Sequence, residues 1–288
     1  MHFHGKNLSN QSGTRTYRAS PAGIPLFAAE FLGEDAKRQR EHYDAVASAY
    51  IENLHYPHTQ EYAAYLDREL MDEIGAAGLG TAAEICCGRG EAFRLLGERV
   101  ERGLGIDISE RMLEAAAAEL PRFAFVQGDA TRLPLADDVL DSVLMLGGIH
   151  HVNDRRALFG EVFRVLKPGG RFYFREPLSD FFLWRALRAV VYRLSPALDH
   201  ETERPLLKHE TVPVLEAAGF RMRTWKTRGF FGFCVFMNSD VLVFNRLFRF
   251  VPGIRGLTRL STRLDHLFTA AMKDAGLQVI GVAEKPAA

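Results

Sequence analysis

The sequence predicts an α/β fold, in which a doubly wound, mostly parallel sheet of seven strands lies between two layers of helices. Short apolar stretches alternate with segments of helical period over residues 77–288. One apolar run ends in the glycine-bearing turn 84–90, and the next ends in Asp107, about 20 residues later. This spacing is typical of a nucleotide-type cofactor site at the carboxyl ends of parallel strands.

The strand candidates are apolar and follow one another along the chain as 82–86, 103–106, 124–127, 142–146, 170–175, 220–227 and 277–284. Between them, the helical period predicts helices over 91–101, 109–120, 154–166 and 212–219. Ser109 is a favourable N-cap, and the Pro-Gly-Gly sequence at 168–170 ends the third of these helices.

The flanking segments differ in composition from this core. Residues 1–34 are rich in Ser, Gly, Asn and Thr toward their start and contain Pro21 and Pro25, so we expect a flexible tail. Residues 35–76 have a helical pattern that breaks at Pro57. Two extra stretches, 177–207 and 230–275, interrupt the core and predict a helical cap.

Charge and cysteine content narrow the class of protein. Thirty-six basic residues balance thirty-six acidic ones, so the molecule has no overall field that would gather nucleic acid. Three cysteines, two of them adjacent, do not predict a disulfide framework or a metal site. No apolar run reaches the ~18–20 residues that span a bilayer. We therefore expect a cytoplasmic protein without bound metal.

Four stretches, read together, resemble a known family. They are Glu84 to Gly90, Gly105 to Ser109, Val126 to Ala130, and Asp141 to His151 running into Arg164 to Arg171. In this order they are similar to the class I S-adenosylmethionine (SAM)-dependent methyltransferases, in the small-molecule branch that includes ubiquinone and menaquinone methyltransferases. The resemblance implies SAM as cofactor and a last strand that runs antiparallel between its neighbours. It also implies that residues 35–76 cover the cofactor.

Two residues of the turn depart from the family pattern. Cys86 occupies the position of the first glycine, and Arg89 that of the usual threonine. A cysteine is small enough to let a methionine tail approach the turn. Arg89 places a cation near the cationic sulfonium, which is acceptable if its side chain points away or pairs with a carboxylate. Glu91 is the neighbouring candidate for that pairing.

The resemblance also implies which residues bind the cofactor. Asp107 would hold the ribose hydroxyls, Asp129 the adenine amino group, and Glu84 would orient the turn or meet the methionine ammonium. A Tyr ring from the segment before the core would lie against the sulfonium. The complete expected set is Tyr50, Glu84, Cys86, Gly88, Gly90, Asp107, Ile108, Met112, Asp129, Ala130, Leu146 and Gly147.

Catalytic groups are fewer, because methyl transfer needs alignment, exclusion of water and in some cases a proton acceptor. His150 and His151 follow the fourth strand and are candidate general bases, and Tyr43 is a third catalytic candidate. Glu176, at the end of the fifth strand, would contact the substrate or pair with Arg175. His55 would line the same pocket.

The two insertions combine apolar residues with arginines, as in Phe181 to Arg185 and Val241 to Arg249. Such a composition suits a lid over an apolar substrate, peripheral contact with an anionic membrane, or a homodimer face. All three uses remain open at this point.

The predicted function is therefore transfer of a methyl group from SAM to O, N or C of a small, apolar or amphiphilic metabolite, and not to nucleic acid. Two alternatives use the same cofactor residues. One is a different SAM chemistry, such as cyclisation or aminopropyl transfer, and the other is a noncatalytic SAM-binding partner protein. An NAD-dependent oxidoreductase is disfavoured, because Phe93 stands where a dinucleotide site needs its third glycine.

Overall fold

The computed structural model describes residues 18–27, 37, 55–186, 204–236 and 243–287. Tyr43 and Tyr50 lie outside the described residues, as do most of the expected tail and parts of both insertions. The expectations for these two tyrosines therefore stay predictions.

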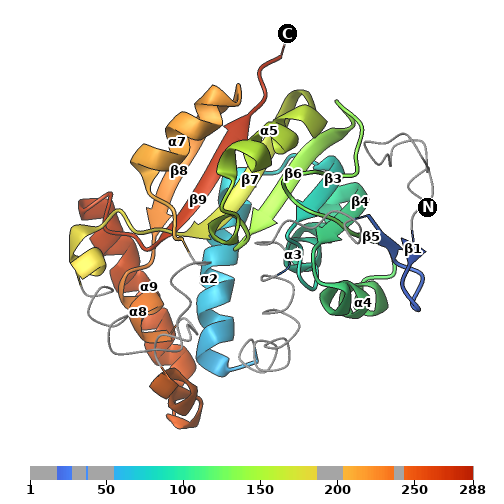
Figure 1. Cartoon of the computed structure of the whole chain (residues 1–288). Coiled ribbons are helices and arrows are strands. Elements are labelled where there is room, and N and C mark those ends of the chain that lie inside the picture. The colour runs from blue at the N-terminus through green and yellow to red at the C-terminus, as the bar shows by residue number, and fades with distance from the viewer. Residues whose placement is uncertain (1–17, 28–36, 38–54, 187–203, 237–242, 288) are drawn as a thin grey trace.

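The described residues form one mixed sheet flanked by helices, as the sequence predicts (Figure 1). Its central strands run in the order β5 (Ala124–Gln127), β4 (Val100–Asp107), β3 (Gly80–Ile85), β6 (Leu140–Leu146), β7 (Leu166–Pro177), β9 (Gln278–Glu284) and β8 (Arg221–Arg228). The first five are parallel, and β9 pairs antiparallel with both β7 and β8. The strand order reverses between β3 and β6, the place where such sheets bind ligands.

Two short strands extend the sheet beyond the seven predicted. β1 (Arg18–Ala19) pairs with β2 (Pro25–Leu26), and β2 lies parallel to β5. The Phe27 amide donates to the carbonyl of Gln127 at 3.0 Å, and Ile24 is buried. This part of the expected tail is thus ordered against the sheet edge. Strands of two residues are too short to show a periodicity in the sequence, which is why the pattern did not predict them.

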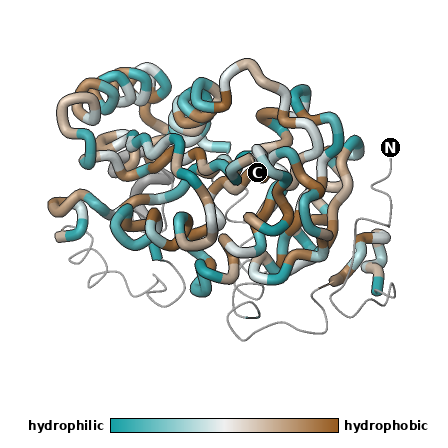
Figure 2. The backbone as a smooth tube through the Cα atoms, turned by 90° about the horizontal axis from the view of Figure 1, so that it is seen from above, coloured by the Kyte–Doolittle hydropathy of each residue, from teal (hydrophilic) through white to brown (hydrophobic). Residues whose placement is uncertain are grey.

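Helices cover both faces of the sheet, and each face has its own hydrophobic core. On one face lie α2 (Pro57–Ile74), α3 (Glu91–Leu96) and α4 (Glu110–Glu119), packed through Leu70, Phe93 and Leu113. On the other lie α5 (Arg155–Val165) and α7 (Lys208–Ala217), packed through Phe159 and Leu215. Figure 2 shows hydrophobic stretches recurring along the interior strands and hydrophilic ones along outer helices.

Helix boundaries follow local chemistry. α2 begins at Pro57, where the sequence pattern breaks, because proline lacks only an N–H that the first helical turn leaves unbonded. α3 ends earlier than the predicted residue 101: the 3-10 turn η1 (Gly97–Arg99) follows it, and β4 begins at Val100, which pairs with Gly80. Pairing in the sheet therefore ends this helix.

The two insertions form a cap at one end of the molecule. The described part includes α8 (Phe231–Phe236), the 3-10 segment η3 (Val243–Phe250) and α9 (Ile254–Ala271). The Phe230 ring lies 5.4 Å from the rings of both Phe181 and Phe268, so residues from the two insertions share one aromatic cluster. α9 runs beside α2, as Figure 1 shows.

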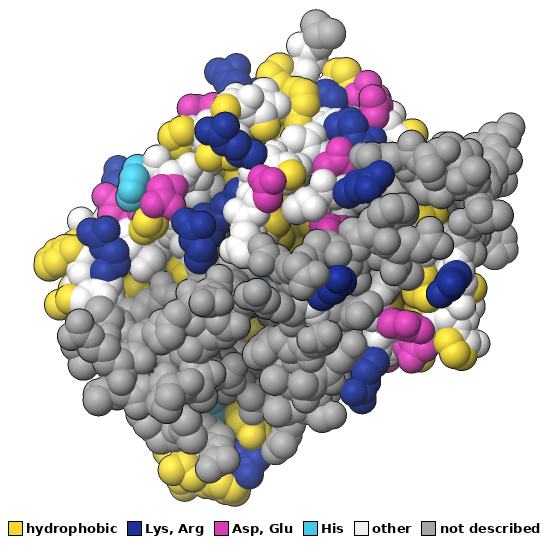
Figure 3. All heavy atoms as spheres, in the orientation of Figure 1, with side chains coloured by type: hydrophobic (Ala, Val, Ile, Leu, Met, Phe, Trp, Pro, Cys, Tyr) yellow, Lys and Arg dark blue, Asp and Glu magenta, His cyan; other side chains and the backbone are white. Residues whose placement is uncertain are grey.

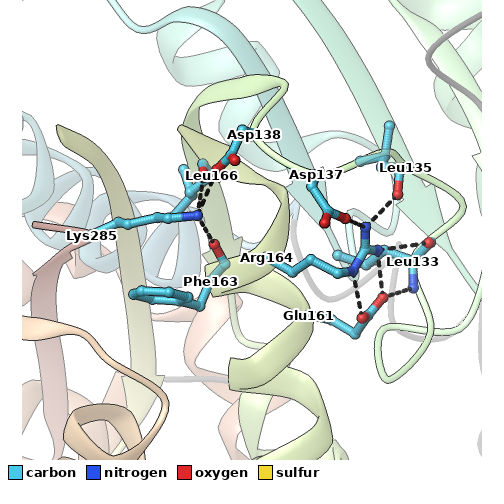
Figure 4. Close-up of polar contacts among 9 residues, drawn as sticks. All are labelled: Leu133, Leu135, Asp137, Asp138, Glu161, Phe163, Arg164, Leu166 and Lys285. Carbon is cyan, nitrogen blue, oxygen red and sulfur yellow. Dashed lines mark hydrogen bonds and ion pairs between the residues drawn. The ribbon is translucent and has the colours of Figure 1, made fainter. Parts of the chain in front are cut away.

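A polar network fastens the sheet at the end where β6 and β7 begin (Figure 4). Arg164 donates to both carboxylate oxygens of Glu161 at 2.8 Å and to Asp137 at 2.7 Å. Lys285 donates to Asp138 and to the carbonyls of Phe163 and Leu166. These contacts hold α5 and the loop before β6 at the end of the sheet opposite to the carboxyl ends of the parallel strands.

No helix among the described residues is long and apolar enough to cross a bilayer.

Candidate active site

The turn after β3 has the backbone that a close ligand approach requires. Cys86, Gly88 and Gly90 all have positive φ, at 52°, 50° and 82°. Glycine adopts this conformation freely, whereas a cysteine there is strained by roughly 1–2 kcal/mol. Cys86 therefore keeps the conformation of the glycine that the family pattern has at its position.

Asp107, at the end of β4, is bonded to this turn. Its Oδ2 accepts from the Gly88 amide at 2.8 Å, and its Oδ1 accepts from the Ser109 amide at 2.9 Å. Ser109 in turn caps α4 by accepting from the Met112 amide. An ionised carboxylate has about four acceptor positions. A carboxylate held in this way at the end of β4 is suited to accept from the two hydroxyls of a ribose.

The end of β5 lies next to Asp107. The Gly128 amide donates to the Asp107 carbonyl at 2.9 Å, which brings Asp129 alongside. Asp129 Oδ1 accepts from both the amide and the hydroxyl of Thr131, at 2.8 and 2.7 Å, and Ala130 between them is buried.

Ile108 and Met112 lie at the junction between β4 and α4. The Ile108 carbonyl accepts from the buried Gln127 amide group at 3.0 Å, and Met112 is buried at the start of α4. Both residues are thus held by the β4–α4 junction.

Glu84 is fully enclosed within β3, beneath the turn. Its two oxygens accept from the amides of Ala92 and Phe93, at 2.8 and 3.1 Å, so it caps the first turn of α3. Burial, and then the nearby charge of Glu91, raises the pKa of Glu84 well above its usual value. Of the two roles expected for Glu84, this geometry corresponds to orienting the turn.

Replacing Glu84 with alanine should lower the free energy of unfolding by about 2 kcal/mol or more, since two buried amides lose their acceptor at roughly 1 kcal/mol each. The folded-state pKa of Glu84 is raised, so its protonated form adds stability below the unfolded pKa of about 4.3, and this stability is lost as pH rises through the folded pKa. Urea unfolding should therefore show a larger difference between wild type and variant at pH 5 than at pH 8. A difference that grows with pH would contradict this.

Glu176 corrects an expectation. It is 0% exposed and contacts the turn after β6: Oε1 accepts from the amides of Gly148 and Ile149 at 2.7 and 2.8 Å. Its Oε2 lies 2.8 Å from Nδ1 of His150. A buried carboxylate with these partners holds the histidine turn η2 (Ile149–His151) in place. It does not pair with Arg175, whose guanidinium instead bonds Asp67 of α2 at 2.5 Å.

The Glu176 carboxylate also selects the tautomer of His150. An ionised carboxylate only accepts hydrogen bonds, so the His150 Nδ1 must donate and the lone pair of the neutral ring lies on Nε2. The His151 ring lies against the His150 ring, with 3.7 Å between centroids. His150 thus has the geometry of an oriented proton acceptor.

A second expectation concerned Arg89. Its guanidinium forms an ion pair with Glu119 at the end of α4, and not with Glu91. Arg94 pairs with the other oxygen of Glu119 at 2.5 Å. The cation at position 89 is therefore drawn toward α4, consistent with the requirement that it be neutralised by a carboxylate.

Cys86 connects the two halves of the site. A Cβ placed on Gly148 would lie only 2.5 Å from the Cβ of Cys86, so the two turns touch. Burial raises the pKa of the Cys86 thiol, and the charges of Asp107, Glu176 and Asp129 raise it further, in that order. Three carboxylates from three strands thus create a negative potential around one neutral thiol, which favours a cationic ligand.

Leu146, Gly147 and His55 are the remaining residues of the predicted set that the structure describes. Leu146 ends β6, and Gly147 follows with φ 78° and nothing within 4 Å of an added Cβ, so its backbone faces open space. His55 precedes α2 with its side chain exposed. Sequence reasoning did not single out Gly148, because its role is a close backbone approach with no side chain to reveal it.

Residues 83–174 match the family model described as "Methyltransferase domain". A demethylmenaquinone methyltransferase of Renibacterium salmoninarum is 30% identical over 139 residues, covering 44% of this chain and 58% of that protein. The chain spans about half the length of the curated relatives that it matches.

Solved structures share the fold. The [4+2]-cyclase SpnF superimposes with a TM-score of 0.58 at 18% identity, covering 88% of this chain and 97% of that one. A SAM-dependent methyltransferase from Thermotoga maritima gives 0.56 at 19% identity, covering 85% and 99%. The predicted fold class is therefore confirmed.

Proposed function

We propose that this chain, whose residues 83–174 match a methyltransferase domain, is a class I SAM-dependent methyltransferase that transfers a methyl group from SAM to a small apolar or amphiphilic acceptor. One observation carries the proposal: contacts run without a break from Asp107 through the turn at Gly88 and Cys86 to Gly148, Glu176 and His150. Cofactor-holding groups and a proton acceptor thus share one site.

The residues present fit this cofactor. Asp107, held at the end of β4 by the Gly88 and Ser109 amides, is the proposed acceptor for the ribose hydroxyls, and Asp129 lies beside it at the next strand end, where an adenine amino group can donate. The negative potential around Cys86 suits the sulfonium. Gly147 leaves open space next to the histidine turn. When bound, SAM supplies a methyl group already activated by its positive sulfur.

The chain itself must align the acceptor and take its proton. His150 is the proposed general base: Glu176 holds its Nδ1, and its Nε2 can accept a proton from an acidic acceptor group. Glu176 is a positioning residue, because it acts through His150 and the Gly148 amide. His151 supports the His150 ring by contact.

The cap supports an apolar acceptor. The amide of Arg204, near the end of the first insertion, donates to the His150 carbonyl at 3.0 Å, so this insertion borders the proposed base. At its other end Phe181 joins the aromatic cluster of the second insertion. Relatives named demethylmenaquinone methyltransferases favour a quinone-type acceptor. An aromatic ring with an apolar tail would fit such a cap.

Ligand binding and product mass test the proposal together. SAM and its demethylated product should each raise the midpoint temperature of thermal unfolding, whereas NAD should not. Incubation with SAM and a short-tailed demethylated quinol should yield a product heavier by one methylene. Stabilisation by NAD alone, a cyclised or aminopropylated product, or binding without any turnover across acceptor classes would each overturn the assignment.

A further inference from the structure

In α9, the outer helix of the cap, the leucines face outward, which is unusual. Its buried positions are Ile254, Thr258, Thr262, Asp265 and Thr269. Leu257, Leu260, Leu264 and Leu267 recur at helical spacing on another face, and each is at least 50% exposed. A helix of a soluble protein normally turns its apolar stripe inward.

Hydrogen bonds hold α9 in this orientation. Asp265 is fully buried and accepts from the amides of Phe230 and Gly232, at 3.0 and 2.7 Å, at the start of α8. The buried hydroxyls of Thr258 and Thr269 are satisfied within α9 itself, because each donates to a carbonyl one turn earlier at 2.8 Å. Turning the leucines inward would expose these bonded groups and leave the α8 amides without an acceptor. The leucine stripe is therefore directed to the exterior by the cap itself.

Further apolar side chains are exposed in the same part of the chain. Every exposed large hydrophobic residue among those the structure describes belongs to the two insertions: besides the four leucines these are Phe182, Leu183, Phe231, Leu247, Phe250, Val251 and Met272. Figure 3 shows hydrophobic side chains next to Lys and Arg at the left margin and the lower end, the region of α9 in Figure 1. The methyltransferase core contributes none, which marks this surface as one used for contact.

The exposed charged residues of α9 itself are all basic. Residues 243–271 contain five arginines and a single acid, which is the buried Asp265. Arg255 and Arg259 lie near Glu61 of α2, with Arg259 bonded to it at 2.8 Å, and Arg263 is exposed one turn further on. Leucines with arginines and without exposed acids are the composition of helices that lie on anionic bilayers.

From these observations we infer that α9 docks on an anionic lipid bilayer, with Leu257, Leu260, Leu264 and Leu267 entering the headgroup boundary and Arg263 meeting lipid phosphates. A second copy of the chain fits less well. A two-fold interface would place the same basic face against itself, and no acid of α9 is exposed to compensate. The inference goes beyond the proposed methyl transfer and does not depend on it.

Vesicle co-sedimentation of the full chain tests this, with phosphatidylcholine vesicles that contain or lack phosphatidylglycerol. Wild-type protein should bind the anionic vesicles at least about tenfold more tightly than the neutral ones, and less tightly as salt rises. The double variant Leu260→Gln/Leu264→Gln should lose about tenfold or more of this binding with unchanged thermal unfolding, because both side chains are already exposed.

Two single variants distinguish the effect of a positive charge on α9 on vesicle binding from the effect of the protein's overall charge. Arg263→Glu should weaken anionic binding severalfold, whereas Arg156→Glu, an exposed arginine of α5 on the other side of the sheet, should not. Equal sedimentation of wild type and the leucine variant would overturn the inference. So would a lipid-free dimer that the leucine substitutions dissociate, since it would assign the stripe to a second copy. Turnover of a short-tailed soluble acceptor, measured in parallel, shows whether methyl transfer stands or fails separately.

Discussion

Replacing Asp107 with asparagine should weaken SAM binding by at least about 100-fold, measured by titration calorimetry. The carboxylate is the proposed acceptor for two ribose hydroxyls, and a hydrogen bond to a charged group contributes roughly 1.5–3 kcal/mol. An amide keeps one accepting oxygen, but its NH₂ faces either the Gly88 or the Ser109 amide, both of which now donate to the carboxylate. The variant thus disturbs the turn and the ligand contact together.

Asp137→Asn is the matched control. This carboxylate lies before β6, at the opposite edge of the sheet, and its side chain is 70% exposed where it meets Arg164. Loss of such a surface ion pair has little effect on stability, about 0–1 kcal/mol. Unchanged SAM affinity is expected for this control. If Asp107→Asn also bound SAM with wild-type affinity while thermal unfolding stayed unaltered, the ribose assignment would be wrong.

The second large effect is expected at the histidine turn. His150→Ala should reduce kcat by about 100-fold or more, which is the usual contribution of a general base, with SAM affinity unchanged. Glu176→Gln should reduce kcat by a smaller factor and leave KM nearly constant. Its side-chain oxygen can still accept from the Gly148 amide, but its NH₂ can no longer accept from Nδ1 of His150.

The double variant distinguishes positioning from a structural role. If Glu176 acts through His150, then His150→Ala/Glu176→Gln is no slower than His150→Ala alone, because the carboxylate has no base left to orient. Multiplied losses in the double variant, or a reduced SAM affinity in Glu176→Gln, would mean that Glu176 mainly supports the turn. His151→Ala serves as the neighbouring control and should reduce kcat less than His150→Ala.

Much of the cofactor half of the site was predictable, because its signals are local. The apolar run before the turn at 84–90 and the acid at 107 each follow a strand, and parallel strands bring their carboxyl ends to one edge. The structure places Asp107 against Gly88 accordingly. Cys86 could be recognised as a substituted glycine only through the family pattern, and the structure shows its positive φ.

What the sequence alone determined was therefore the succession of strands along the chain and the set of groups at their ends. The tertiary structure decided which hydrogen-bond or ion-pair partner each of these groups has. Glu176 accepts from backbone amides that lie 27 and 28 residues away along the chain. Every residue except proline has such an amide, so the sequence does not indicate which ones a side chain will bond. Arg89 forms its ion pair with Glu119 and not with Glu91, because α4 folds against the turn. The bond from the Gly232 amide of α8 to buried Asp265 decided that the leucines of α9 face outward.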